Sequence, residues 1–233
     1  MKLKVIVTGA QGLVGEGVLL KCLESSAIGE VLSVGRWTCG IKHVKLKELI
    51  LPDLVDIDDY EKQLTGYHAC FYCSRIIPAG LDDDLYAKFA IDPALSFASR
   101  LLILNPNIVF NFLSRYRNGT IHHKETKIDG MIESALSKLT FRKLFFFRSN
   151  LIAPMAKQNN VYFFSKVLSF SLPLLRLIIP NKINTSSEVG LAMINILLMD
   201  VKKNQLEVKD IRALARNVIV ANAENKVFAF SDV

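Results

Sequence analysis

The amino-acid sequence predicts an α/β fold, in which a doubly wound parallel sheet carries helices on both faces. Two observations lead to this prediction. Short runs rich in Val, Ile, Leu and Phe alternate with longer helical segments, an alternation typical of parallel strands joined by crossover helices. Glycines at positions 9, 12 and 15 also follow the first strand and open the first helix. With 233 residues and no repeat or Gly/Ser linker, the chain fits a single domain.

Each element is expected from its own local pattern. Short β-branched and aromatic runs bounded by turn residues predict strands, and longer periodic or continuous apolar segments predict helices. Pro93 should kink or divide its helix, and Ser186 or Ser187 can cap the helix that follows. Strands are expected at Leu3–Thr8, Val31–Val34, Leu46–Leu51, Ala69–Ser74, Ile108–Ser114 and Leu144–Arg148, helices at Gly12–Leu23, Tyr60–Leu64, Asp82–Leu104, Asp129–Lys138, Val161–Ile179, Glu188–Met199 and Val208–Ala215, and a small hairpin at Val218–Val220 and Val227–Phe230.

The net charge of +7 comes largely from one stretch of the chain. Between Ser114 and Arg148 there are eight Lys or Arg residues against three acids. Such a segment can bind nucleic acid or an anionic ligand, or form a solvated face. No nucleic-acid-binding motif and no interleaved aromatic platform accompanies it. We therefore expect no nucleic-acid partner, and an anionic small-molecule ligand remains open.

The cysteines and the N-terminus indicate a reduced, cytoplasmic protein. Four cysteines without framework spacing are typical of a reducing compartment. Cys70 and Cys73 match a CxxC pattern, but they lie in an apolar strand, where residues three apart point to opposite faces. The four histidines have no ligand spacing, so no metal is expected. No leader peptide is expected either, because the chain starts with a charged tetrapeptide followed at once by a strand.

The most apolar stretch, Val161–Pro180, is interrupted by Lys166, Pro173 and Arg176. A helix needs about 20 mostly apolar residues to span a bilayer. We therefore expect a helix that is buried in the core or in a homodimer interface, and no transmembrane span. A peripheral contact with a membrane surface is the alternative.

The glycines after the first strand have the spacing GxxGxxG, and each has a separate physical use. Gly9 permits the tight turn out of the strand, Gly12 lets a pyrophosphate approach the backbone, and Gly15 lets the helix pack closely. The helix N-terminus then offers free N–H groups and a positive dipole to the phosphates. The pattern predicts a Rossmann-type dinucleotide-binding turn, in which the residues expected at the ligand are Gly9, Gln11, Gly12, Leu13, Val14 and Gly15.

We expect this single domain to have two parts. Residues 1–150 form the expected dinucleotide-binding core. Residues 151–233 have fewer strands, and we expect them to form a C-terminal helical extension beside the carboxyl edge of the sheet. Ligand crevices form at that edge in such folds, so the extension is a small substrate-side region.

The end of the second strand predicts which dinucleotide is bound. A carboxylate at this position would accept hydrogen bonds from the ribose hydroxyls of NAD, but the sequence has Arg36. An arginine can pair with the 2′-phosphate of NADP. We expect NADP, with NAD possible and a merely solvated Arg36 as the alternative. Asp53 and Leu54, after the third strand, are expected to meet the adenine.

The run Val7–Leu20, VTGAQGLVGEGVLL, resembles the extended and atypical short-chain dehydrogenase/reductase superfamily. Within it, the chain is similar to bacterial NAD-dependent epimerase/dehydratase-like NAD(P)-binding proteins, relatives of the Tat-interacting-protein type. The resemblance extends to about Asn217. Further agreement lies in Ser33–Arg36, Asn105–Asn107, Glu188–Met193 and Asp210–Ala215.

The resemblance implies a nicotinamide cofactor across the switch point of the sheet, with a catalytic Ser at the end of the fifth strand. Ser114 matches that position. The resemblance also implies a Tyr-x-x-x-Lys pair on the next helix, in which the Tyr is the acid/base and the Lys lowers its pKa. Cofactor contacts are implied at the ends of the fourth and sixth strands, at Cys73, Ser74, Arg75 and Arg148.

The sequence departs from the family at the reacting end. The helix that directly follows Ser114 carries no Tyr-x-x-x-Lys, and Glu125 and Asp129 stand where the Tyr and Lys would be. Tyr116 is close in sequence but differently spaced. Arg75 replaces a small residue, and this bulky cation can crowd the cofactor or add a phosphate contact. Relatives carry Arg-Pro-Gly where this chain has Arg148 followed by Ser and Asn.

Three hypotheses follow. In the first, the protein binds NADP but its hydride chemistry is weak or lost, and it acts as a cofactor sensor or scaffold. In the second, it is an active oxidoreductase or epimerase-like enzyme that uses a relocated acid such as Tyr116. In the third, it is an interaction module that no longer binds a nucleotide.

Overall fold

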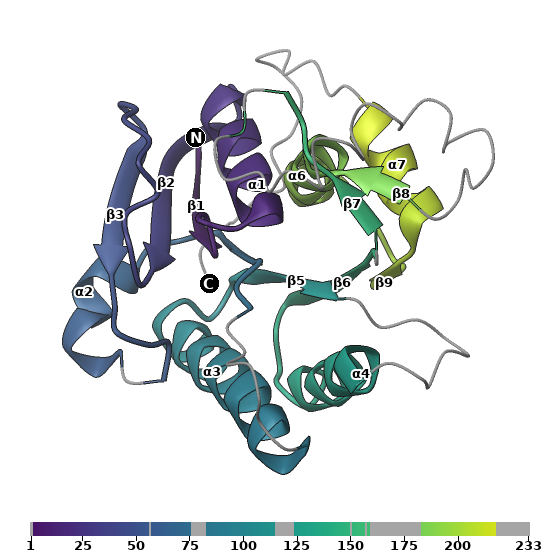
Figure 1. The fold of residues 1–233 in the computed structure, drawn as a ribbon. Helices are drawn as coiled ribbons and strands as arrows, with labels where there is room; N and C mark the ends of the chain where they lie inside the picture. The colour runs from purple at the N-terminus through teal and green to yellow at the C-terminus, as the bar shows by residue number, and fades with distance from the viewer. Residues whose placement is uncertain are drawn as a thin grey trace.

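Short runs of Val, Ile, Leu and Phe form the strands, and the longer segments between them form helices (Figure 1). The structure is a computed structural model that describes residues 2–55, 57–75, 83–114, 124–149, 151–156, 158 and 183–217. Its elements are β1 (Leu3–Thr8), α1 (Leu13–Glu24), β2 (Ile28–Gly35), β3 (Leu46–Ile50), η1 (Asp58–Tyr60), α2 (Glu61–Leu64), β4 (Ala69–Tyr72), α3 (Asp83–Leu104), β5 (Val109–Ser114), α4 (Lys124–Leu136), β6 (Lys143–Arg148), β7 (Leu151–Ala153), β8 (Ile183–Thr185), α6 (Ser186–Asn195), η2 (Ile196–Leu198), β9 (Gln205–Leu206) and α7 (Val208–Arg216).

Within the described part of the chain, seven strands form one sheet in the order β3-β2-β1-β4-β5-β6-β9. Every neighbouring pair in this sheet is parallel. The strand β1 pairs with β2 on one side and β4 on the other, so that Val7 lies opposite both Ser33 and Phe71. The order of the strands reverses at β1, and a crevice opens at such a switch point in doubly wound folds. The predicted α/β, Rossmann-type architecture is confirmed.

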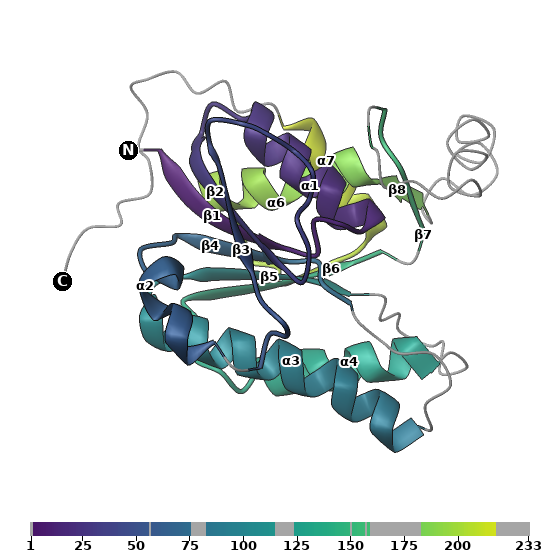
Figure 2. The same ribbon diagram turned by 60° about the vertical axis from the view of Figure 1, so that its left-hand side comes forward.

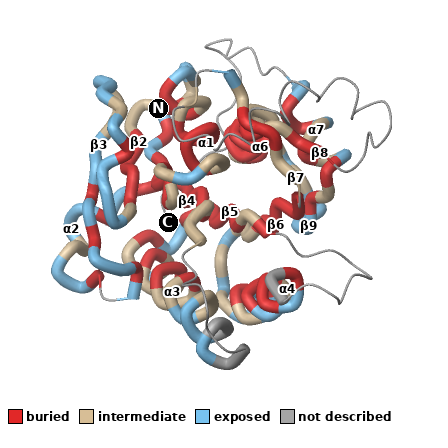
Figure 3. The backbone as a smooth tube through the Cα atoms, in the orientation of Figure 1, coloured by how far each residue is buried: buried red, intermediate tan, exposed pale blue. Residues whose placement is uncertain are grey.

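Helices cover both faces of the sheet, as Figure 2 shows. On one face, α1, α6 and α7 bury residues such as Val18, Met193 and Ile211 against the sheet. On the other face, α3 and α4 bury residues such as Phe97 and Ile132. Figure 3 shows that buried positions follow the central strands between these two layers. The sheet is therefore covered on both sides, which suits its nearly continuous apolar strands.

Helix α3 continues through Pro93, so the expected division of this helix is wrong, whereas the alternative of a kink stays a prediction. A proline inside a helix removes one backbone hydrogen bond. Here the turns around it bury Ala94, Phe97, Ala98 and Leu101 in the core, and this packing offsets that loss. Helix α4 begins at Lys124, five residues before the expected Asp129.

Three short strands were not expected from the sequence. β7 pairs with β8 in a small parallel sheet of two strands, and β9 extends the main sheet beside β6. The C-terminal segment thus lies at the sheet edge through β9, and it also covers one face through α6, which packs against α1. The expected helix Val161–Ile179 and the expected hairpin after Asn217 lie outside the described residues.

Candidate functional site

The turn that follows β1 can form only with glycine at its first position. Gly9 has a φ of +70°, and a Cβ atom there would lie 2.8 Å from both the Cys73 carbonyl oxygen and the Ser74 Cα. The left-handed φ and this close approach both exclude larger residues. The Gly12 N–H donates to the Gly9 carbonyl at 2.9 Å, which closes the turn.

The other two glycines of the motif are in different surroundings. A Cβ on Gly15 would lie 2.1 Å from the Gly9 carbonyl oxygen, so helix α1 packs directly on the turn. A Cβ on Gly12 would have the same oxygen as its nearest neighbour at 3.4 Å, an ordinary contact. Gly12 caps α1 without a side-chain hydrogen bond. This geometry agrees with the predicted roles of Gly9 in the turn and of Gly15 in helix packing. The role of Gly12 in letting a pyrophosphate approach stays a prediction.

Thr8 fixes the neighbouring strand end in place. Its buried Oγ1 accepts hydrogen bonds from the backbone N–H of Cys73 at 3.1 Å and of Ser74 at 3.0 Å. The residues that follow β4 are therefore held against the glycine turn. Sequence reasoning missed Thr8, because nothing local to the strand indicates a partner 65 residues away.

A cavity of about 620 Å³ lies at the carboxyl ends of these strands. Every residue predicted at the cofactor lines it, with the exception of Arg148. Gly35 and Trp37, which flank Arg36, were missed, as was Leu113, the residue before Ser114. The full lining is Gly9, Gln11, Gly12, Leu13, Val14, Gly15, Gly35, Arg36, Trp37, Leu51, Asp53, Leu54, Cys73, Ser74, Arg75, Leu113, Ser149 and Ile152.

The side chain of Gln11 connects the glycine turn to the end of β2. Its amide donates to the Trp37 carbonyl. A Cβ on Gly35 would lie 2.9 Å from that amide, so glycine at this position makes room for Gln11. Arg36 is exposed, and Trp37 is 70% exposed beside the cavity. The two segments that line this end of the cavity are thus held together.

A second, smaller chamber of about 210 Å³ adjoins the first. Arg36, Asp53, Leu54, Ser74 and Arg75 line both spaces. The rest of its wall is mostly apolar and comes from Pro52, which follows β3, and from β4, β5, α3 and α4. The residues of these four elements include Tyr72, Phe89, Pro93, Phe112 and Ile132, together with Asp129.

Arg75 and Asp129 form an ion pair at this junction. The Arg75 Nη2 donates to both carboxylate oxygens of Asp129, at 2.5 and 2.7 Å. The Asp129 side chain is fully buried, whereas 21% of the Arg75 side chain is exposed. The acid that the resemblance places at the Lys position therefore holds a cation from the end of β4.

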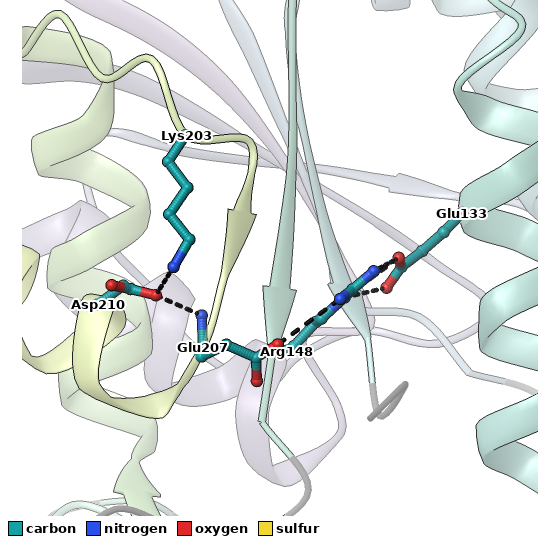
Figure 4. A network of polar contacts seen from close by, with 5 residues as sticks. All are labelled: Glu133, Arg148, Lys203, Glu207 and Asp210. Atoms are coloured by element: carbon teal, nitrogen blue, oxygen red, sulfur yellow. Dashed lines mark hydrogen bonds and ion pairs between the residues drawn. The ribbon is translucent and has the colours of Figure 1, made fainter. Parts of the chain in front are cut away.

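Arg148 does not reach the cavity, because two other carboxylates hold it (Figure 4). Its side chain is 4% exposed, and its guanidinium contacts Glu133 on α4 at 2.5 Å and lies 3.6 Å from Glu207 before α7. Burial works against the charged form, but the hydrogen bonds and charges of Glu133 and Glu207 outweigh it and raise the pKa of Arg148. This arginine joins α4 to the C-terminal segment and is not placed to contact a ligand in the cavity.

The predicted catalytic residues are not brought to the cavity by the described part of the structure. Ser114 is fully buried, and alternation along β5 puts it on the same face as Phe112, toward α3 and α4. Tyr116 and the side chain of Glu125 lie outside the described residues. Tyr72 lines the smaller chamber, but burial, with a further effect of Cys70, raises the pKa of its phenol despite the opposing charge of Arg75. Such a phenol is a weak acid.

The cysteines show no sign of redox or metal chemistry among the described residues. Cys70 and Cys73 pack toward opposite faces of the sheet, as expected from their spacing, and both are free thiols. Burial raises the pKa of the Cys73 thiol to about 12. No group of His, Cys, Asp and Glu in the described ranges could hold a metal ion. None of the helices described is long and apolar enough to cross a bilayer.

Comparison with known proteins gives a clear structural answer. No protein-family model matches the sequence, and no curated protein is significantly similar to it in sequence. Among solved structures, a short-chain dehydrogenase family protein from Francisella tularensis has a TM-score of 0.57 at 15% identity, over 86% of this chain and 92% of that one. The chain has the short-chain dehydrogenase/reductase fold.

Two further solved structures with the same fold belong to proteins that use a nicotinamide cofactor. UDP-glucuronic acid 4-epimerase from Bacillus cereus, solved in complex with NAD, has a TM-score of 0.60 at 13% identity, over 88% of this chain and 76% of that one. An NADPH-dependent reductase of bacilysin biosynthesis has a TM-score of 0.58 at 15% identity, over 88% and 95%. The narrower resemblance to the Tat-interacting-protein type stays a prediction from the sequence motifs.

Proposed function

We propose that this short-chain dehydrogenase/reductase-like protein binds NADP(H) across the ends of β1, β2 and β4. The observation that carries the proposal is the 620 Å³ cavity at the reversal of strand order, lined by the glycine turn. The residues fit the ligand, because a Cβ on Gly12 would meet only an ordinary contact at 3.4 Å, and the helix N-terminus there has no side-chain cap. Phosphates bind at such uncapped N-termini.

The end of the cavity beside β2 supports NADP as the preferred ligand. Arg36 lines it, and a guanidinium there can pair with a 2′-phosphate. Asp53, which also lines the cavity, follows β3, and its Oδ1 accepts from the Val55 N–H at 2.9 Å. The end of β2 itself presents a cation. The adenosine half would then lie on the β2 and β3 side, near Leu54.

A substitution at Gly12 tests the proposal without removing the helix cap. Gly12→Asp places a carboxylate where the pyrophosphate would lie, and Gly12→Asn is its neutral match. Both residues are good N-caps, so both variants should fold. Like charges brought together cost several kcal/mol. We expect calorimetric titration to show NADPH binding lost in Gly12→Asp and weakened less in Gly12→Asn. Equal, undiminished binding by wild type and Gly12→Asp would overturn the proposal.

We further propose that carbonyl reduction is weak or absent, and that the protein acts as a cofactor sensor or scaffold. A nicotinamide supplies hydride, and the protein must then supply a proton donor, whose help is typically worth about a hundredfold to ten-thousandfold in rate. No Tyr or Lys lines the larger cavity within the described residues. Ser114 is buried and Tyr72 is a weak acid.

A screen of aldehydes, ketones and quinones with NADPH tests this second part. We expect cofactor binding with little oxidation of NADPH across the panel. Robust turnover that survives Ser114→Ala and Glu125→Gln but is lost in Tyr116→Phe would contradict it. That result would make the protein an NADPH-dependent oxidoreductase with Tyr116 as its acid.

A further inference from the structure

Arg75 has an unusual combination of restraint and access. It follows β4, and its guanidinium is held by the fully buried carboxylate of Asp129 on α4, at 2.5 and 2.7 Å. It nevertheless keeps 21% of its side chain exposed and lines both the larger cavity and the smaller chamber. A cation that served only to pair with a buried acid would not need to line the cavities.

The hydrogen bonds of Arg75 leave part of its guanidinium available. Among the described residues, its hydrogen bonds both run from Nη2 to Asp129. A guanidinium has five N–H donors in a rigid fork, so those at Nε and Nη1 remain for a ligand. The rigid pairing also restricts the side chain before a ligand arrives, which reduces the entropy that binding would cost.

The position of Arg75 after β4 identifies which part of a dinucleotide it can contact. The glycine turn follows β1, Arg36 follows β2 on one side, and Arg75 follows β4 on the other. A dinucleotide crosses the switch point with its pyrophosphate at the turn. If Arg36 faces the adenosine half, the half beside β4 and β5 is the nicotinamide nucleotide.

We infer that Arg75, oriented by Asp129, binds ribose and phosphate oxygens of the nicotinamide half of NADP(H). The inference rests on the proposed function. Arg75 is then a ligand-binding residue and Asp129 a positioning residue. Position 129 on α4 has an acid where the resemblance implies a lysine. Arg75, after β4, supplies the positive charge instead, and Asp129 holds it in place.

The single variant Arg75→Met would leave the buried Asp129 carboxylate without this cation, and breaking a buried pair is strongly destabilising. We therefore choose the neutral double variant Arg75→Gln/Asp129→Asn, and the variant Arg75→Lys. The lysine keeps a charge for Asp129 but lacks the planar fork of donors. The matched control is Arg100→Gln, which removes a guanidinium on α3 that pairs with Asp58 and Glu61 and lines neither cavity.

Comparing the whole ligand with its adenosine half tests whether Arg75 contacts the nicotinamide half. We titrate each protein with NADPH and with adenosine 2′,5′-bisphosphate, which lacks the nicotinamide nucleotide. Both Arg75 variants should bind NADPH about tenfold or more weakly, as expected for one charge-assisted hydrogen bond. They should bind the bisphosphate as wild type does, and Arg100→Gln should change neither affinity.

Equal losses for both ligands, or no loss of NADPH affinity in the folded Arg75→Lys protein, would overturn the inference. In those cases wild type still binds NADPH, and the proposed function stands. If wild type binds neither ligand, the proposed function itself fails and this inference fails with it.

Discussion

At the scale of single residues, the site depends on how much room each backbone position leaves. Gly9 and Gly15 leave none, because a Cβ at either position would approach backbone atoms at 2.8 Å or less. Gly12 leaves the space of an ordinary contact. Gly9 and Gly15 are therefore needed by the fold, and Gly12 is free to serve a ligand.

This difference predicts opposite effects of small substitutions. Gly15→Ala places its Cβ 2.1 Å from the Gly9 carbonyl oxygen, and overpacking of this kind costs about 1–3 kcal/mol. Gly12→Asn exchanges one acceptable N-cap for another, a change of only a few tenths of a kcal/mol. Urea denaturation of the two variants measures both costs. A Gly15→Ala protein as stable as Gly12→Asn would show that the turn is more adaptable than described.

The sequence predicted residues whose use depends on the local chain. The glycine turn is such a case, because its spacing and its position after a strand determine its geometry. Ser114 and Arg148 were placed at the ligand from the resemblance alone. The position of the Arg148 side chain depends instead on distant partners, because Glu133 and Glu207 hold it. No local sequence pattern indicates those pairings.

At the scale of elements, α4 is fastened to the sheet by two carboxylates one turn apart. Asp129 forms an ion pair with Arg75, which follows β4, and Glu133 forms one with Arg148 at the end of β6. Both acids are buried. The same helix would therefore hold one cation at the cavity and lock another away from it.

The buried pair of α4 should matter far more to stability than an exposed pair in the same network. Glu133→Gln leaves the 4% exposed Arg148 without its bidentate partner, and such a loss costs about 3–5 kcal/mol. Lys203 pairs with Asp210 at 2.5 Å but is 52% exposed, so Lys203→Gln should cost about 0–1 kcal/mol. Chemical denaturation of the two variants compares them directly. Similar costs would contradict a structural use of the Arg148 pair.

Long elements were predictable from the sequence and short ones were not. The strands β1, β4, β5 and β6 carry apolar runs that stand out from their surroundings. The strands β7, β8 and β9 have only two or three residues each, which is too short for alternation to be recognised. The expected division at Pro93 is wrong because propensity yields to the burial of the helix face around it.

At the scale of the whole molecule, the order of the strands determines where a ligand can bind. The parallel sheet brings the ends of β1, β2 and β4 to one edge, and the reversal of order at β1 opens the cavity between their loops. Residues as far apart in sequence as Gly9 and Ile152 line that cavity. The alternation of strands and helices was sufficient to predict a parallel sheet with helices on both faces, whereas the order of the strands was not predicted from it.

The central claim is that this cavity binds NADP(H), and a calorimetric titration of the wild-type protein with NADPH and with NADH tests it most directly. We expect saturable binding at one site per chain, with NADPH tighter by about tenfold to a hundredfold, the strength of one charge-assisted hydrogen bond to Arg36. In Arg36→Ala the two ligands should bind about equally. A folded wild-type protein that shows no saturable binding of either ligand, or that binds NADH more tightly, would contradict the account.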